Sequence, residues 1–88
     1  MGGRFARKKV DAMQLHLSGH LAWYDPQKRS QVKVRVPGTI ALTDLLRDLG
    51  IPVAEIAITV VNGAVVDLPT VSVTDADRVE LFPPVGGG

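Results

Sequence analysis

Hydrophobic and polar positions alternate twice near the start of the chain, over residues 13–18 and again over residues 32–36. A period of two places every second side chain on the same face, as in a strand that is buried on one side. The residues expected to face the core are Met13, Leu15, Leu17, Val32, Val34 and Val36. Between the two stretches, residues 22–31 contain Asp25-Pro26 and a polar cluster, which indicates a loop or a wide hairpin connection. The pattern therefore predicts an N-terminal β-hairpin.

A helical period follows. The leucines that recur at this spacing are Leu42, Leu45, Leu46 and Leu49. Thr43 is a good N-cap residue, and Asp44 would lie in the first turn, where the helix dipole favours a negative charge. Gly50 can end the helix in the left-handed conformation, and Pro52 cannot continue it, so that residues 53–56 form at most a further turn. We expect one short amphipathic helix here.

The second half of the chain returns to strands. Residues 57–61 are β-branched and apolar almost throughout, which favours a central strand that is covered on both faces. Asn62-Gly63 is a strong hairpin signal, so a short strand is expected over residues 64–67. Residues 74–77 form a second polar turn before the last strand. In that strand, one face carries Val79 and Leu81 and the other carries Glu80 and Phe82.

The order of these elements is strand, strand, helix, strand, strand, strand. In fewer than about 100 residues, one domain is expected, and this order predicts an α+β fold of the β-grasp (ubiquitin-like) type. Its mixed sheet would have four to five strands with one main helix packed across it. We place the domain at residues 13–85, between a disordered basic leader over residues 1–12 and a flexible glycine tail over residues 86–88.

Composition excludes several classes of protein. The chain has 88 residues, 45% hydrophobic and 22% charged, with no cysteine, which excludes disulfides, thiolate metal sites and a cysteine nucleophile. No apolar run approaches the roughly 18–20 residues that span a bilayer, and no signal-peptide segment is seen. A net charge of +1, without aromatics interleaved among the basic residues, argues against nucleic-acid binding. These features predict a cytoplasmic protein that binds neither membranes nor nucleic acid.

Candidate catalytic residues are few. His16 and His20 are spaced to share one face, but no third ligand accompanies them, so a metal site is not expected. Neither a nucleophile elbow nor a glycine-rich phosphate loop occurs in the sequence. The chain is therefore not expected to be an enzyme or to hold a cofactor.

The end of the chain, "LFPPVGGG", carries the most specific chemistry. Phe82 faces away from Val79 and Leu81, so it is expected to stay outside the core, as aromatic residues at interfaces do. Pro83 and Pro84 favour an extended segment that holds the following residues away from the domain. Glycines without a Cβ can thread a narrow channel. The terminal carboxylate of Gly88 would then be an acyl group on a stalk. The alternative is a frayed end without a function.

With these motifs in place, the sequence resembles the MoaD/ThiS family of ubiquitin-like sulfur carriers. The resemblance covers residues 13–88 and is most specific at Phe-Pro-Pro-Val, which is similar to the small subunit of molybdopterin synthase. It implies that an activating enzyme uses ATP to adenylate Gly88 and that sulfur transfer then yields a thiocarboxylate. Gly86 and Gly87 would thread the partner's active site. The docking contacts would be Phe82, Pro83, Pro84 and Val85.

The resemblance also implies partners. These are an adenylyltransferase of the MoeB/ThiF type, related to ubiquitin-activating enzymes, and a sulfur-accepting synthase such as the large subunit of molybdopterin synthase. The most favoured pathway is molybdopterin biosynthesis, for the molybdenum or tungsten cofactor, and the alternatives are thiamin synthesis and tRNA thiolation. A protein modifier that is conjugated through Gly88, or a non-covalent β-grasp interaction module, also remains open.

Overall fold

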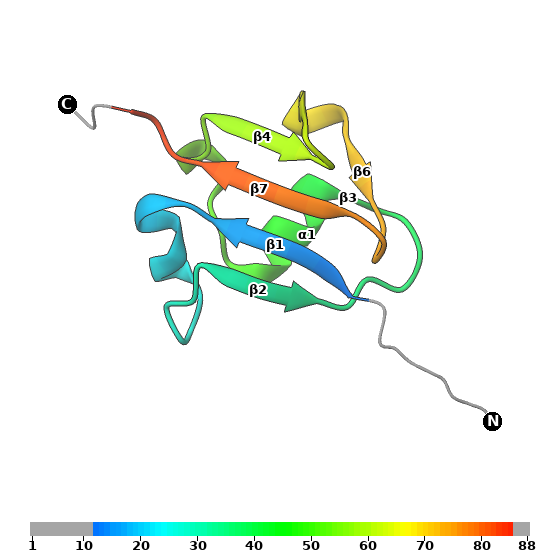
Figure 1. Cartoon of the computed structure of the whole chain (residues 1–88), viewed down its shortest axis with the longest axis horizontal. Helices are drawn as coiled ribbons and strands as arrows, with labels where there is room; N and C mark the ends of the chain where they lie inside the picture. The colour runs from blue at the N-terminus through cyan, green and yellow to red at the C-terminus, as the bar shows by residue number, and fades with distance from the viewer. Residues whose placement is uncertain (1–11, 86–88) are drawn as a thin grey trace.

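Within the described part of the chain, a five-stranded mixed sheet forms one layer, and a single α-helix packs across one of its faces (Figure 1). The computed structural model describes residues 12–85. The strands of the sheet follow the order β2-β1-β7-β4-β5, and β1 and β7 run parallel in the middle. In chain order the elements are β1 (Met13–Leu17), η2 (Gly19–Tyr24), β2 (Gln31–Val34), β3 (Ile40–Ala41), α1 (Leu42–Leu49), η3 (Val53–Glu55), β4 (Ile58–Val61), β5 (Ala64–Val66), η4 (Leu68–Thr70), β6 (Ser72–Val73) and β7 (Arg78–Phe82).

This arrangement confirms the predicted β-grasp fold. The N-terminal hairpin is present, because β1 and β2 pair antiparallel with Leu15 opposite Val32. The helix provides the crossover that brings the later strands back to the sheet, as a parallel pair of strands requires. A small second sheet of β3 and β6, which the sequence pattern did not reveal, closes the end of the molecule beside α1.

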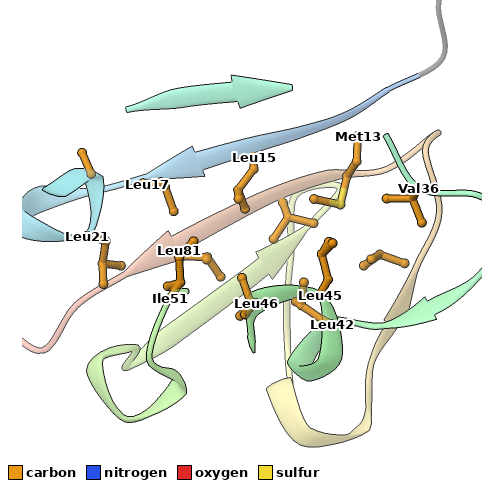
Figure 2. Packing of buried hydrophobic residues seen from close by; sticks show 13 residues of the cluster. Met13, Leu15, Leu17, Leu21, Val36, Leu42, Leu45, Leu46, Ile51 and Leu81 are labelled. Atoms are coloured by element: carbon orange, nitrogen blue, oxygen red, sulfur yellow. The ribbon is translucent and has the colours of Figure 1, made fainter. Parts of the chain in front are cut away.

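The core lies between the sheet and the helix (Figure 2). On β1, Met13, Leu15 and Leu17 are at most 1% exposed, as the alternation predicted. The helix adds its apolar stripe, and Ile51 and Leu21 close the end of the cluster near the start of β4. The residues of α1 and β7 that are buried with them are Leu42, Leu45, Leu46, Val79 and Leu81. The space between the two layers is therefore filled mainly by aliphatic side chains, together with Met13 and the buried Thr59 of β4.

Two predictions about local structure are wrong. Thr43 is not the N-cap of α1: the helix begins at Leu42, and Ala41 precedes it with extended backbone and without a side-chain cap. The reason is that Ala41 already pairs in β3, so the chain passes directly from strand to helix. Strand β4 is not covered on both faces, because Ile58 is 45% exposed. The single helix covers one face of the sheet, and apolar residues on the other face of β4 stay at the surface.

Asn62 and Gly63 form the predicted hairpin turn between β4 and β5. Both have positive φ, 52° and 87° respectively, which is the conformation that a tight hairpin with two central residues requires. The side-chain Nδ2 of Asn62 donates a hydrogen bond to Oδ1 of Asp77 over 2.8 Å. The side-chain Oδ1 of Asn62 accepts a hydrogen bond from the backbone N–H of Arg78 over 2.9 Å. The hydrogen bond from Asn62 lowers the pKa of the Asp77 carboxyl. These hydrogen bonds join the turn at Asn62-Gly63 to the turn over residues 74–77 at the same end of the sheet.

Asp25 organises the connection between η2 and β2. The residue is 7% exposed, and its carboxylate accepts hydrogen bonds from the backbone of Gln27 and Arg29 and from the Arg29 guanidinium. The guanidinium, with its two hydrogen bonds, holds the pKa of the Asp25 carboxyl well below its usual range. The segment that the sequence indicated as a loop is thus a 3₁₀-helix followed by a turn that is built around a charged pair.

Replacing Asp25 by Asn is expected to destabilise the fold at neutral pH, because the charge that Arg29 neutralises is lost. A carboxyl whose pKa is lower in the folded state than in the unfolded chain stabilises the folded state at pH values above the unfolded pKa. This contribution is lost as the pH falls below that value. The difference between the wild type and D25N should therefore shrink below about pH 4, near the pKa of an Asp in an unfolded chain. Urea unfolding over a pH series measures this. A difference that does not change with pH would contradict the assigned role.

Candidate functional site

The C-terminal tail leaves the domain from the middle of the sheet (Figure 1). Strand β7 ends at Phe82, whose carbonyl oxygen accepts from the Ala57 N–H over 2.8 Å. On the other side of β7, the Ser18 N–H donates to the Leu81 carbonyl oxygen over 3.0 Å. After Phe82 the chain becomes progressively exposed, and Val85 is 96% exposed. The root of the tail is therefore held on both sides, and Pro84 and Val85 beyond it are exposed.

Gly19 allows η2 to pack against this root. It has a φ of +57°, and a Cβ at this position would lie only 3.1 Å from Cγ of Pro83. Contacts this short require the neighbouring atoms to give way, and the backbone conformation itself is one that favours glycine. The close approach between the start of η2 and the first proline of the tail thus depends on a residue without a side chain.

A polar bridge connects the two segments that flank the root. Nε2 of His20 in η2 lies 2.9 Å from Oε1 of Glu55 in η3, and both side chains are about half exposed. The ring of His20 also meets Tyr24 edge-on, with centroids 6.4 Å apart. Two residues after Glu55, Ala57 makes the hydrogen bond to Phe82. The bridge therefore ties η2 to the segment that leads into β4.

The face of the sheet that is opposite α1 carries an apolar patch beside the root. Inward-facing side chains alternate with outward-facing ones, so Phe82 and its cross-strand neighbour Ile58 point away from the core. Two residues after Ile58 on β4, Val60 faces the same way and pairs with Val65 of β5, which is 74% exposed. We call these four residues, Ile58, Val60, Val65 and Phe82, the open-face patch. An exposed apolar cluster of this kind, continuous over three strands, is typical of a protein-binding surface.

Polar side chains occupy the same face farther from the tail. They surround a shallow hollow of about 280 Å³ that is lined by Gln14, His16, Gln31, Arg78 and Glu80. Nδ1 of His16 lies 3.1 Å from the Gln31 amide, and its ring centroid is 6.5 Å from that of Phe82. His16 thus marks the border between the hollow and the open-face patch. The face offers a partner an apolar half and a polar half.

The two histidines belong to different sites. The strand ends at Leu17, so His16 is on β1, whereas His20 is in η2 with Glu55 as its partner. Within residues 12–85, no three His, Cys, Asp or Glu side chains gather closely enough to hold a metal ion. None of the helices over this range is both long and apolar enough to cross a membrane.

The site residues that the sequence indicated lie partly within the structure. Phe82 and Pro83 are half-buried at the root, and Pro84 and Val85 are exposed beyond it. Gly86, Gly87 and Gly88 lie outside the described residues, as does the predicted leader except for Ala12. Sequence reasoning missed the contributions of Ile58, Val60 and Val65 to the open-face patch. For Ile58 and Val60 the available signal is the excess of apolar residues on both faces of residues 57–61, which equally predicts a fully covered strand.

Comparison with known proteins gives three findings. The family model described as the ThiS family matches residues 21–88, which includes the glycine tail. The crystal structure of SAMP1 from Haloferax volcanii is similar to this chain, with a TM-score of 0.63 and 26% sequence identity over 88% of this chain and 99% of that one. None of the curated proteins compared with the chain matches its sequence significantly.

Proposed function

The chain belongs to the ThiS family, and from this membership we propose that it is a sulfur carrier whose working group is the carboxylate of Gly88. Small carriers of the ThiS and MoaD type act together with an activating enzyme and an acceptor enzyme, and are not enzymes themselves. The observation that carries the proposal is that the family match extends through the glycine tail to Gly88. The fold supports it, because the tail begins at a firmly held root beside an exposed apolar patch.

The chemistry follows from the reactivity of carboxylates. A carboxylate is a poor acyl donor, so one Gly88 oxygen attacks the α-phosphorus of ATP in the activating enzyme, which releases pyrophosphate and forms an acyl-adenylate. A sulfur nucleophile at the oxidation level of hydrosulfide then attacks the carbonyl carbon, and AMP leaves with that oxygen. The product is a thiocarboxylate. This chain supplies the acyl group, and the activating enzyme supplies ATP and the groups that stabilise the developing charge.

The described residues have defined roles in this proposal. Pro83 and Pro84 keep the start of the tail extended, so that Gly86 and Gly87 reach a narrow channel in the partner. Phe82, at the border between sheet and tail, contacts the partner at the entrance of that channel. Ile58 and Val65 extend this contact over the sheet, since apolar and aromatic residues contribute most to binding when they lie at the centre of an interface.

The acceptor that we propose is the large subunit of molybdopterin synthase. The support is the Phe82-Pro83-Pro84-Val85 sequence before the glycines, which resembles the small subunit of that enzyme. Thiamin synthesis and tRNA thiolation are the alternative destinations. Incubating the thiocarboxylated chain with each candidate acceptor in turn, and measuring which one consumes the sulfur, distinguishes the three.

Mass spectrometry tests the carrier function directly. Incubation of the chain with ATP, an activating enzyme of the MoeB/ThiF type and a sulfur donor is expected to raise its mass by about 16 Da, the replacement of one oxygen by sulfur. Fragmentation should place the change at Gly88. The absence of any mass gain with an enzyme that thiolates a related carrier under the same conditions would refute the proposal.

A protein modifier is the second candidate, because the same acyl-adenylate can react with a lysine amine instead of sulfur. Conjugation through Gly88 would give adducts of higher mass in cells that produce the chain, and these would disappear when the glycines are removed. A non-covalent interaction module, in contrast, would keep its partners after residues 86–88 are removed.

Ile58→Glu is expected to weaken recognition by the activating enzyme without unfolding the domain. The side chain is 45% exposed in the open-face patch, so a buried charge in the complex should raise KM by about tenfold or more, with a smaller effect on kcat. Arg47→Glu, on the exposed surface of α1 in the other layer, is the matched control and should leave KM unchanged. Equal KM values for the two variants would show that the enzyme does not dock on this face.

A further inference from the structure

The charges of the protein are distributed unevenly along the chain. Residues 23–36 carry four basic side chains and one acidic one, whereas residues 37–85 carry seven acidic side chains and two basic ones. The basic residues of the first segment are Lys28, Arg29, Lys33 and Arg35. The whole chain has a net charge of +1, but residues 23–36 are basic and residues 37–85 are acidic.

The basic segment lies along one edge of the sheet. It comprises the end of η2, the turn after it and strand β2, which is the first strand in the sheet order (Figure 1). Among the residues described, β2 pairs only with β1, so its other backbone edge is unpaired. Lys33 and Arg35 are exposed and alternate with the inward-facing valines. The basic charge is thus presented on an accessible edge. Strands β1 and β7 separate this edge from the residues of the open-face patch on β4 and β5, and β1 separates it from Phe82 on β7.

The acidic residue of the segment does not reduce this positive surface. Asp25 is 7% exposed, and its two carboxylate oxygens accept four hydrogen bonds from Gln27 and Arg29. Its charge is therefore satisfied within the turn. Lys28 is exposed, and its Nζ donates to the carbonyl oxygen of Trp23 over 3.3 Å, which places the ammonium group beside the backbone of η2.

Trp23 lies at this edge and is exposed, although tryptophan is a large apolar residue. It is the only tryptophan of the chain and is 73% exposed, while the neighbouring Tyr24 is 37% exposed. The core cluster consists of aliphatic side chains and Met13, and neither Trp23 nor Tyr24 belongs to it. A tryptophan that is left in water loses the stabilisation that burial would bring, and tryptophan and tyrosine are enriched among the residues that dominate binding energy at interfaces.

We propose that this basic edge, defined by Trp23, Tyr24, Lys28, Lys33 and Arg35, is a docking site for an acidic segment of a partner protein. An apolar side chain of that segment packs on Trp23, and its carboxylates face the three basic side chains. Complementary charge selects the partner and accelerates association, and the aromatic contact contributes most of the affinity. The site uses neither the tail nor the open-face patch, so a partner can bind here while Gly88 is engaged elsewhere.

A protein segment fits this edge better than a nucleic acid does. Proteins that bind single strands carry aromatic residues spaced along a basic groove, so that successive bases stack on them. Here both exposed aromatic residues lie at one end of the edge, on consecutive positions of η2. The acidic remainder of the domain also repels a long polyanion, whereas a short acidic segment of a protein stays within the basic edge.

A selection experiment with the full chain tests this proposal. A displayed library of random linear peptides is selected on the wild type, after depletion on a variant that carries Trp23→Ala and Lys33→Glu. The enriched peptides are expected to be rich in Asp and Glu around an aromatic or aliphatic residue. Enrichment of peptides without acidic residues, or no enrichment above the depleted background, would overturn the proposal.

Titration of the best peptide into defined variants then locates the site. Trp23→Ala, and separately the pair Lys28→Glu with Lys33→Glu, should each weaken binding by about tenfold or more. The affinity of Trp23→Ala for the peptide should depend on salt concentration as that of the wild type does. The affinity of the double lysine variant should lose most of this salt dependence. Ile58→Glu and deletion of Gly87-Gly88 are the matched controls and should bind as the wild type does. Because these controls impair only the proposed carrier function, the two proposals can fail independently.

Three results would contradict the docking site. Binding that survives both basic-edge changes but is lost in Ile58→Glu would move the site to the open-face patch. Tighter binding of a uridine homopolymer than of the best acidic peptide at equal salt would indicate a nucleic-acid site. Sedimentation that shows a dimer, lost on Trp23→Ala, would assign the edge to a second copy of this chain. Thermal melts of each variant exclude unfolding as the cause of lost binding.

Discussion

Deletion of Gly87 and Gly88 is expected to abolish the ATP-dependent mass gain of about 16 Da completely, while the melting temperature of the domain stays the same. The last strand ends at Phe82, and among residues 12–85 the packed core contains no residue beyond Leu81. The proposed chemistry, in contrast, needs an acyl group at the end of a tail of fixed length. Loss of activity without loss of stability is the signature of a carrier tail. Intact-mass spectrometry and a thermal melt of the same sample measure both.

Gly87→Val separates the two roles of the tail. The variant keeps the carboxylate of Gly88 but places a β-branched side chain where the tail would thread a narrow channel. Misplacement of the reacting group by about 1 Å can reduce a rate by about 100-fold, so we expect activation to fall at least that far. Removal of Gly88 alone leaves two glycines and tests whether the length counted from Phe82 matters. A truncated chain that gains the same mass as the wild type would refute the assignment of Gly88.

Leu46→Ala is expected to cost about 2–5 kcal/mol of unfolding free energy, a large part of the stability of a small domain. Leu46 is fully buried at the centre of the helix–sheet interface (Figure 2). Truncation removes apolar contacts and leaves a cavity, because close-packed neighbours relax only in part. Each kcal/mol should lower Tm by about 4–8 °C in a domain of this size. Denaturant titration followed by circular dichroism gives the free energy.

Leu49→Ala is the matched control for this prediction. Leu49 is on the same helix and has the same side chain, but it is only partly buried at the edge of the core. Because less apolar surface is removed from water there, the loss should be clearly smaller than at Leu46. Equal losses for the two leucines would contradict the assigned position of the core.

Much of the fold could be predicted because local signals in the sequence agree with the tertiary structure. The alternation over Met13 to Leu17 predicted which side of β1 is buried, and the helical spacing of the leucines predicted the buried face of α1. Asn62-Gly63 predicted the hairpin through the positive φ that its turn requires. Gly50, with φ of 78°, ends the helix as expected. Each of these signals acts over a few residues and needs no knowledge of distant partners.

The predictions that failed concern features that depend on distant segments. Thr43 has the chemistry of an N-cap, but pairing of β3 with β6 extends the regular backbone up to Leu42 and moves the start of the helix. The apolar run at residues 57–61 could not reveal how many of its faces are covered. That depends on the number of helices available to cover the sheet, and only one α-helix packs against it over residues 12–85.

Local signals in the sequence were enough to predict the β-grasp elements and the buried leucines, because hydrophobic period and turn residues are local properties. From the geometry of its prolines and glycines the sequence also predicts an extended tail that can thread a channel. The place where the tail starts, between Ser18 and Ala57 in the middle of the sheet, depends on tertiary contacts. The tertiary structure also decided that Ile58 and Val65 stay exposed beside Phe82 and that Trp23 stays outside the core. Exposure depends on which segments pack together across the chain, and one helix can cover only one face of a sheet.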